Sequence, residues 1–173
     1  VLPPLEIIDE VVSTSWRKPG ELFPGRLKSI TDRADVRKSS VPDRVARAAK
    51  IASECKGQVI VACGLNDEST ACADAIPDSV EMTGSDSFEV KNETIMRFIR
   101  GEIRVLVTKS RMVAFGLNLQ NAATLICVGM SDSYELYYQS VRRCWRFGQT
   151  RPVAVDIIST DGETRVQANM QRK

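Results

Sequence analysis

Short apolar segments alternate with helical patterns along most of the chain, and this alternation constrains the fold more than any other feature. Residues 58–63, 103–107 and 123–128 are nearly continuous apolar runs, which is typical of strands buried on both faces of a parallel sheet. Helical segments separate these runs, and strand and helix alternate about five times in all. Parallel strands need right-handed crossovers, which place helices on both faces of the sheet. We therefore predict an α/β fold of three layers with a mostly parallel central sheet.

The remaining elements follow from the same periodicities. Further helices and strands are expected at 42–54, 66–75, 80–82 and 153–158. Asp86 and Glu89 resemble a capping box before another helix, which ends at Gly101. The apolar residues that this helix is expected to bury are Phe88, Ile95, Phe98 and Ile99.

Residues 1–41 lack this regular alternation, so we place a domain boundary after them. Residues 1–12 are expected to be extended and able to add to an edge of the sheet. From 13 to 40 periodicity is lost, prolines and glycines recur, and basic residues outnumber acidic ones. We predict that 1–41 is a linker, either simply solvated or with its basic residues directed at nucleic-acid phosphates. Residues 42–173 are expected to form the domain.

Composition excludes several classes of function. The net charge is only +2, so a nucleic-acid site would have to be a local patch. The absence of histidine excludes histidine-based catalysis and histidine metal ligands. The five cysteines form no CxxC pair, and we expect reduced, mostly buried thiols in a cytoplasmic protein without a zinc site. No apolar run reaches the ~18 residues of a membrane span. Because the first residue is not Met, we expect the chain to be part of a longer protein.

The segment 134–153 carries the most distinctive pattern of side chains. Its helical periodicity predicts one apolar, buried face, made of Tyr134, Tyr137, Tyr138, Val141 and Trp145. The opposite face is predicted to carry Gln139, Arg142, Arg143 and Arg146. Gly148 and then Pro152 would end the helix. Arginines spaced by three or four residues repel one another, so the row indicates either an anion, whose oxygens match the guanidinium fork, or a solvated helix face.

Loops at the carboxyl ends of the strands are the second place where chemistry is expected, because parallel sheets bind ligands there. The groups that follow the strand 103–107 are, in order, Thr108, Lys109, Arg111, Gly116 and Asn118. Hydroxyl and basic groups suit a phosphate backbone, the glycine permits close approach of a ligand, and the amide can hydrogen-bond a sugar hydroxyl. An ordinary surface loop is the alternative.

The sequence QSVRRCWRFGQTRPV, residues 139–153, resembles motif VI of the Swi/Snf-type superfamily-two helicases, whose pattern is Q-x-x-x-R-x-x-R-x-G-Q-x-[KR]-x-V. The matching residues are Gln139, Arg143, Arg146, Gly148, Gln149, Arg151 and Val153. Arg142 departs from the family, which usually has an Asp there. Other segments are similar to motifs of the same family in the same order: QVIVAC to motif IV, Met82-Thr83-Gly84 to its LTG segment, and GLNL at 116–119 to motif V.

This resemblance, which spans about 42–160, implies the C-terminal RecA-like lobe of an ATP-dependent DNA helicase or translocase. ATP with Mg²⁺ would be held mainly by an N-terminal RecA-like lobe of the same polypeptide, and 1–41 would be an interlobe segment. The family pattern implies that Arg143 and Arg146 are arginine fingers. Its nucleotide-side residues correspond to Gly116, Asn118 and Gln139. Its DNA-backbone contacts correspond to Thr83, Gly84, Thr108, Lys109 and Arg111, with duplex DNA expected.

Two motifs of such motors are missing from the chain. There is no GxxxxGK[ST] phosphate loop. Asp67-Glu68-Ser69 superficially resembles a DExx box, but it begins a helix and no phosphate loop precedes it, so we reject it as a catalytic pair. We expect this chain alone to be inactive as an ATPase. The close similarity to compact phage-type members suggests a phage or prophage source.

Two other classes of function stay open. The first is a non-catalytic nucleic-acid-binding α/β module, in which the arginine helix only binds phosphates. The second is a small doubly wound protein that binds a nucleotide or a partner, although CGLND is a poor phosphate loop. Within the helicase interpretation, an RNA-directed enzyme is possible, but the R-x-G-Q ending of motif VI favours DNA.

Overall fold

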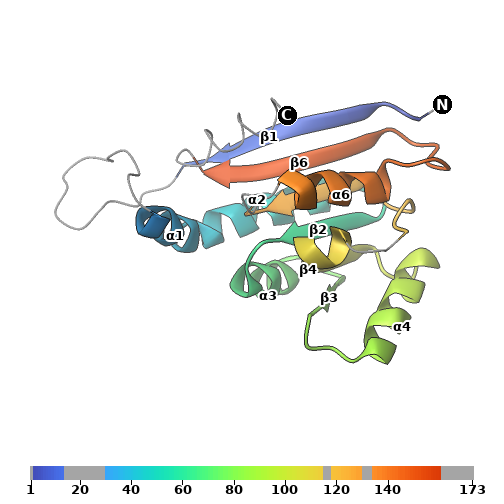
Figure 1. Cartoon of the computed structure of the whole chain (residues 1–173), viewed down its shortest axis with the longest axis horizontal. Coiled ribbons are helices and arrows are strands. Elements are labelled where there is room, and N and C mark those ends of the chain that lie inside the picture. Colours follow the sequence, from blue (N-terminus) through green and yellow to red (C-terminus); the bar gives the residue numbers. More distant parts are fainter. Residues whose placement is uncertain (1, 14–29, 115–117, 130–133, 161–173) are drawn as a thin grey trace.

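One parallel sheet forms the centre of the molecule (Figure 1). The computed structural model describes residues 2–13, 30–114, 118–129 and 134–160, with side chains from 35 onward in the second range and from 135 onward in the last. The strands are β1 (Leu5–Val12), β2 (Val59–Cys63), β3 (Ser79–Met82), β4 (Val105–Lys109), β5 (Thr124–Val128) and β6 (Val153–Thr160). Their order is β1-β6-β5-β2-β4-β3, and all neighbours pair in parallel. The predicted fold class is confirmed.

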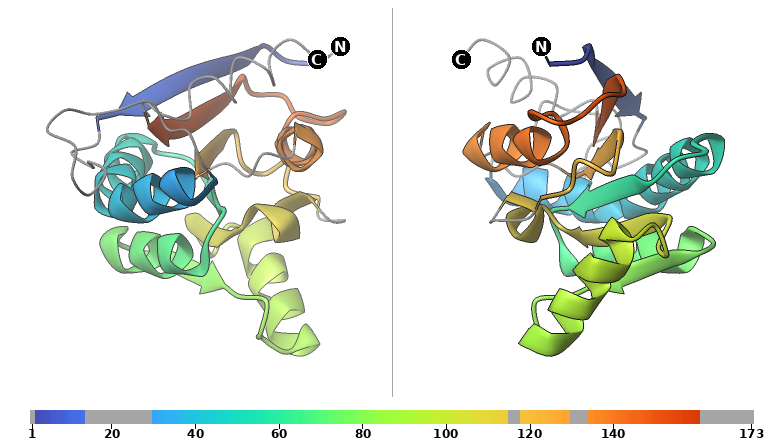
Figure 2. Two further views of the ribbon diagram at one scale, coloured as in Figure 1. Left: turned by 60° about the vertical axis from the view of Figure 1, so that its left-hand side comes forward. Right: turned by 90° about the vertical axis from the view of Figure 1, so that its right-hand side faces the viewer.

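Helices cover both faces of this sheet (Figure 2). They are α1 (Ile30–Ser39), α2 (Val41–Glu54), α3 (Asn66–Ala75), α4 (Phe88–Ile99), α5 (Ser110–Ala114) and α6 (Tyr134–Cys144). Because side chains alternate along a strand, Val59, Val61 and Cys63 of β2 join the core under α2 and α3. Ile60 and Ala62 join the core under α4, α5 and α6. Burial from both sides is the reason why β2 is apolar at every position.

The N-terminal strand β1 lies at one edge of the same sheet. The expectation that residues 1–12 are extended and can add to a sheet edge is confirmed. The strand pairs with β6 over eight residues, from Leu5 opposite Val153 onward. Arg47 on α2 binds Glu10 through both oxygens, at 3.1 and 2.6 Å, and this contact fastens β1 to the helix layer. The predicted boundary after residue 41 therefore does not mark a break in the fold. Residues 14–29 lie outside the described residues, so the interlobe role of 1–41 stays a prediction.

The helix α4 differs from its prediction at both ends. Phe98 is fully buried, but Phe88 is 79% exposed and Ile99 is 37% exposed. The reason is that β3, which α4 follows, is a four-residue edge strand, so the sheet does not extend under the whole helix. The N-cap is Ser87, whose Oγ accepts the Val90 N–H at 3.3 Å, rather than Asp86.

Cysteine burial agrees with the prediction from composition. All five cysteines are unpaired, and four of them are buried. Burial raises the pKa of the Cys127 and Cys144 thiols to about 12, so neither is a thiolate at neutral pH. Among the described residues, no group of three histidines, cysteines or acids is placed to hold a metal ion.

Candidate functional site

The helix α6 presents its arginines differently from the two-face prediction. Ser140, Val141 and Cys144 are its buried residues, whereas Tyr138 is 44% exposed. The Arg142 guanidinium lies over the rings of Tyr138 and Trp145, with its carbon 5.7 and 5.9 Å from their centroids. Positions i, i+3 and i+4 share one side of a helix, so Arg142 belongs with these aromatic rings, and its predicted place on the opposite face is wrong.

Arg143 reaches the end of the neighbouring helix α5. Its Nε and Nη2 both donate to the Ala114 carbonyl oxygen, at 3.1 and 2.7 Å. Ala114 is the last residue of α5, and a cation at that position satisfies a carbonyl that has no partner inside the helix. The half-buried Arg143 therefore connects α6 to α5.

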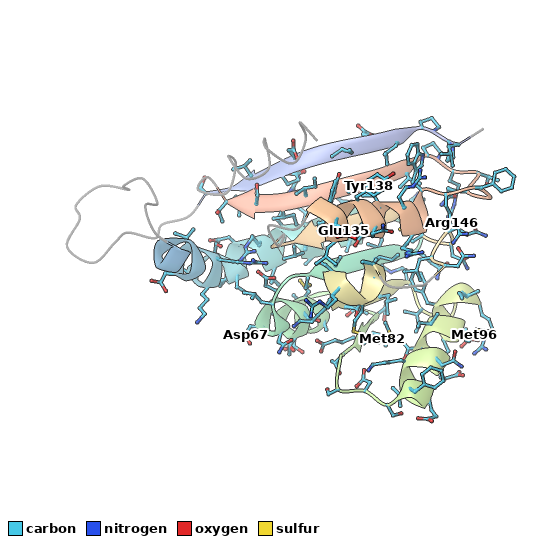
Figure 3. The ribbon with its side chains drawn as sticks, viewed as in Figure 1. Asp67, Met82, Met96, Glu135, Tyr138 and Arg146 are labelled. Carbon is cyan, nitrogen blue, oxygen red and sulfur yellow. The ribbon has the colours of Figure 1, made fainter. Side chains whose placement is uncertain are left out.

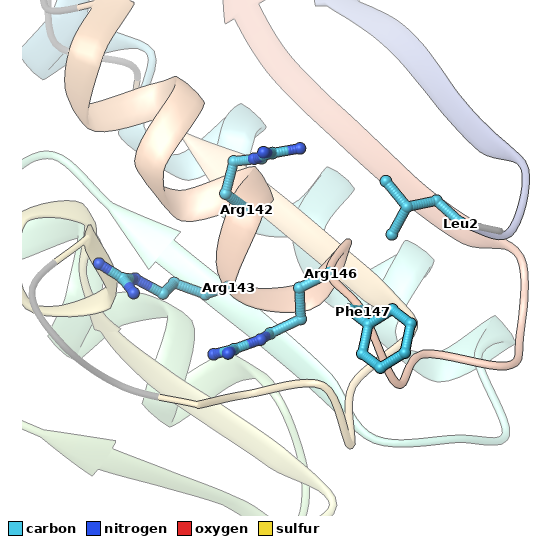
Figure 4. Close-up of a pocket in the computed structure, with 5 residues that line it drawn as sticks. All are labelled: Leu2, Arg142, Arg143, Arg146 and Phe147. Atoms are coloured by element: carbon cyan, nitrogen blue, oxygen red, sulfur yellow. The ribbon is translucent and has the colours of Figure 1, made fainter.

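Arg146 lies beyond the last residue of α6, on an exposed turn. Figure 4 shows Arg143 and Arg146 extending to the same side of α6, whereas Arg142 extends to the other. Together with Leu2 and Phe147, the three arginines line a pocket of about 580 Å³. No carboxylate lines this pocket among the described residues. The structure thus brings the two predicted finger residues together in a cationic recess.

The carboxyl ends of β3 and β4 hold the predicted DNA contacts. The two strands pair in register, with Met82 opposite Thr108, so Thr83 and Gly84 emerge beside Lys109. Gly84 is exposed, Lys109 is half-buried and Arg111 is exposed. No atom lies within 4 Å of the position of a Cβ on Gly84, so this part of the edge is open.

Asp86 shapes the turn that presents Thr83. Its Oδ2 accepts the Thr83 N–H at 2.7 Å, and this hydrogen bond is the main reason why the pKa of Asp86 is lowered. The Thr83 and Ser85 hydroxyl oxygens are 2.9 Å apart, and Lys91 Nζ donates to the Gly84 carbonyl oxygen at 2.7 Å. These contacts together hold the turn that follows β3.

Thr108 has a different role from the one predicted. It is fully buried, and its hydroxyl donates to the Met82 carbonyl oxygen at 2.7 Å. A side chain without exposed surface does not contact a phosphate backbone, so its burial argues against the direct contact. Thr108 instead holds β4 to β3. Asn118 is exposed and Gln139 is half-buried, and Gly116 lies outside the described residues.

Glu68, part of the rejected DExx-like tripeptide, is fully buried. One carboxylate oxygen lies 2.7 Å from Nη1 of Arg44, which is also fully buried. The other accepts the N–H groups of Gly64 and Leu65, at 3.0 and 2.8 Å. Figure 3 shows Asp67, at the start of α3, and Arg146 toward opposite ends of the molecule. The tripeptide and the cationic pocket therefore form no common site.

Solved structures similar to the chain define its fold as RecA-like. The C-terminal domain of the DEAD-box protein Dbp5 aligns with a TM-score of 0.68 and 11% identity, over 99% of this chain and 84% of that one. The C-terminal part of the Fun30 ATPase domain gives 0.65 and 18%, over 76% and 45%. A DEAD box protein from the hyperthermophile Methanococcus jannaschii gives 0.65 and 16%, over 76% and 36%. The chain thus spans less than half of the last two proteins.

Residues 43–148 match the family described as the helicase conserved C-terminal domain. This match covers more than half of the chain, and the chain belongs to that family. The predicted helicase C-terminal lobe is therefore confirmed, whereas the Swi/Snf type and the phage source stay predictions. No curated protein matches the chain. Within the described ranges, no helix combines the length and the apolar character needed to cross a membrane.

Proposed function

We propose that this chain is the second motor lobe of an ATP-dependent DNA helicase or translocase of the Swi/Snf type. In this proposal, it supplies arginine fingers and DNA-backbone contacts to a longer protein and is inactive without the first lobe. The observation that carries the proposal is the pocket at the end of α6 that Arg142, Arg143 and Arg146 line. Its guanidiniums, with no carboxylate from the described residues beside them, fit the phosphate groups of ATP.

The two arginines have distinct environments, which supports distinct roles. Arg146 is exposed and free to extend toward a γ-phosphate held by another lobe. Arg143 is held by Ala114, so its guanidinium has a fixed position at the end of α5. Charge stabilisation by such a finger accelerates phosphoryl transfer by about 10³–10⁵ in other systems. Gln139, Gly116 and Asn118 would line the nucleotide side, and Mg²⁺ would be held mainly by the first lobe.

The strand ends of β3 and β4 would hold the DNA backbone. Thr83, Gly84, Lys109 and Arg111 combine hydroxyl, backbone and basic groups at one edge of the sheet. Contacts of this kind fix position without selecting sequence, as a translocating motor requires. Thr108 would contribute by fastening β4 to β3. We propose duplex DNA rather than RNA because motif VI ends in R-x-G-Q. We propose a cytoplasmic location because the cysteines are free thiols.

The test is DNA-stimulated ATP hydrolysis by the two-lobed protein that carries this domain. Arg146→Ala and Arg143→Ala should abolish most turnover and leave DNA affinity and ATP binding near wild type. Arg100→Ala is the matched control, because it removes an exposed arginine at the C-cap of α4 whose side chain pairs with Glu93 and Glu102. Normal hydrolysis with weakened DNA binding in the Arg146 and Arg143 variants would instead establish a phosphate-binding module without fingers.

A further inference from the structure

The side-chain amide of Gln149 is buried in the turn after α6, and both of its ends are engaged. Only 6% of the residue is exposed. Its Nε2 lies 2.8 Å from the carbonyl oxygen of Gln120, 3.1 Å from that of Ala122 and 3.4 Å from that of Cys144. Its Oε1 accepts the backbone N–H groups of the next two residues, each at 3.1 Å.

These contacts join three segments that are separate in the chain. Residues 120–122 lead into β5, Cys144 ends α6, and the turn at Gln149 leads into β6. Arg146 lies between Cys144 and Gln149, and its carbonyl oxygen accepts the Gln149 N–H at 3.0 Å. The backbone of Arg146 is therefore fixed on both sides, although its side chain is exposed.

Neighbouring residues restrict the same turn. Gly148 has a φ of +98°, and a Cβ there would lie 3.0 Å from the Gln120 side-chain oxygen. Trp145, on the other side of the turn, donates its Nε1–H to the Pro3 carbonyl oxygen at 2.8 Å. Gly148 thus needs a left-handed conformation that favours glycine, and the path of the turn is defined from both directions.

We propose that Gln149 is a positioning residue for Arg146. The inference rests on the proposed function, because it concerns the finger role of that arginine. An exposed arginine side chain reaches a phosphate correctly only if its backbone is held, and a displacement of about 1 Å costs as much as ~100-fold in rate. An amide suits this place because it donates to the carbonyls and accepts from the N–H groups at once, whereas a carboxylate only accepts.

Gln149→Glu in the two-lobed protein tests this inference. The change keeps the shape and places a second acceptor against three carbonyl oxygens. We expect kcat of DNA-stimulated ATP hydrolysis to fall about 10- to 100-fold, with the KM for ATP and the affinity for DNA changed less than about twofold. Gly148→Ala disturbs the same turn through the backbone and should act in the same direction, which keeps the test available if Gln149→Glu does not fold.

Gln58→Glu is the matched control for stability. The Gln58 amide also donates to two backbone carbonyls, those of Phe98 and Ile103, at 2.6 and 2.8 Å. It lies before β2, remote in the chain from α6. If Gln58→Glu lowers thermal stability as much as Gln149→Glu does, it should still keep the wild-type kcat of ATP hydrolysis. If both variants lower kcat equally, Gln149 is only structural and the inference is wrong.

A double variant separates this inference from the finger assignment. If Gln149 acts through Arg146, adding Gln149→Glu to Arg146→Ala should slow hydrolysis no further. If the double variant is slower than Arg146→Ala by the factor that Gln149→Glu causes alone, the two residues act independently and the positioning role is wrong. A normal rate for Arg146→Ala alone would overturn the proposed finger itself, whereas a slow Arg146→Ala beside a normal Gln149→Glu would overturn this inference only.

Discussion

Two groups of arginines lie at opposite ends of the sheet, and they differ in how their charges are satisfied. Arg37 and Arg44 lie beside Glu68, at the carboxyl ends of β2 and β5. Arg143 and Arg146 lie where α6 ends, close in the chain to the start of β6. The first group is buried or largely buried and has its carboxylate partner, while the second lines a pocket to which the described residues contribute no carboxylate.

The buried group is a polar network centred on Glu68. Arg44 Nε donates to Ser40 Oγ at 3.1 Å, and its other nitrogens reach Glu68 and the Arg37 carbonyl oxygen. Arg37 in turn donates to the Gly129 carbonyl oxygen, just after β5. Such a network positions strand ends, because both guanidiniums share the Glu68 carboxylate inside the fold. An arginine that the fold leaves without a carboxylate is instead available for an external anion.

Breaking the buried pair should have the largest effect on stability. Glu68→Ala leaves the buried Arg44 cation without its partner, so the free energy of unfolding of the 173-residue chain should fall by about 3–5 kcal/mol. Chemical denaturation monitored by circular dichroism measures this loss. A loss below about 1 kcal/mol, the range of an exposed ion pair, would remove the distinction between the two groups.

A buried carboxylate on β6, Asp156, sharpens the comparison, because Arg47, the cation that opposes its raised pKa, is already bound to Glu10. Asp156 is 5% exposed, and burial raises its pKa from 3.8 to about 6, with Glu10 adding to the shift and Arg47 opposing it. The folded state thus holds this proton more tightly than the unfolded state. Its contribution to the free energy of unfolding therefore falls as pH rises from about 4 to about 6 and is constant above.

Asp156→Asn should consequently stabilise the chain at neutral pH. The gain over wild type should grow between pH 4 and pH 6 and reach about 2–3 kcal/mol above that window, because the pKa differs by about two units between the folded and unfolded states. Chemical denaturation of both proteins at a series of pH values measures this gain. The other carboxylates titrate in both proteins, so their contribution cancels in the difference between the two free energies of unfolding. A gain that does not depend on pH would show that Asp156 has an ordinary pKa.

The sequence predicted the centre of the fold better than its periphery, and the reason is burial. β2, β4 and β5 are covered on both faces, so their apolar composition was a direct signal. α1 was missed because its only buried side chain in the described part is Val36, which produces no periodicity. Phe88 was misplaced because an apolar residue at an edge looks the same in sequence as one in the core.

The candidate site was predictable in its motifs but not in its contacts. Arg143 and Arg146 were identified through the resemblance to motif VI, and both line one pocket of the structure. The sequence could not show that Thr108 is buried or that Arg143 binds Ala114, because both depend on neighbours that the fold supplies from elsewhere in the chain. The contact of Arg142 with aromatic rings three and four residues away follows from helical spacing, and the two-face prediction missed it.

Arg143→Ala should affect stability moderately. It removes two hydrogen bonds to one helix-terminal carbonyl, so a loss of about 1 kcal/mol is expected. Arg143→Lys supplies a cation without the planar fork and should recover only part of the loss. Equal stability of wild type and Arg143→Ala, measured by denaturation, would mean that Arg143 is as free of the fold as Arg146.

Arg146→Ala should affect stability least of all, which is the other half of the comparison. The residue is exposed, and in the described part of the chain no carboxylate lines its pocket, so the free energy of unfolding should stay within about 0.5 kcal/mol of wild type. Removing one of three neighbouring positive charges also relieves repulsion, which favours a small gain over a small loss. The measurement is made at low salt, where that repulsion is strongest. A loss above about 1 kcal/mol would show that the fold itself uses Arg146, and that this arginine belongs with Arg44 rather than apart from it.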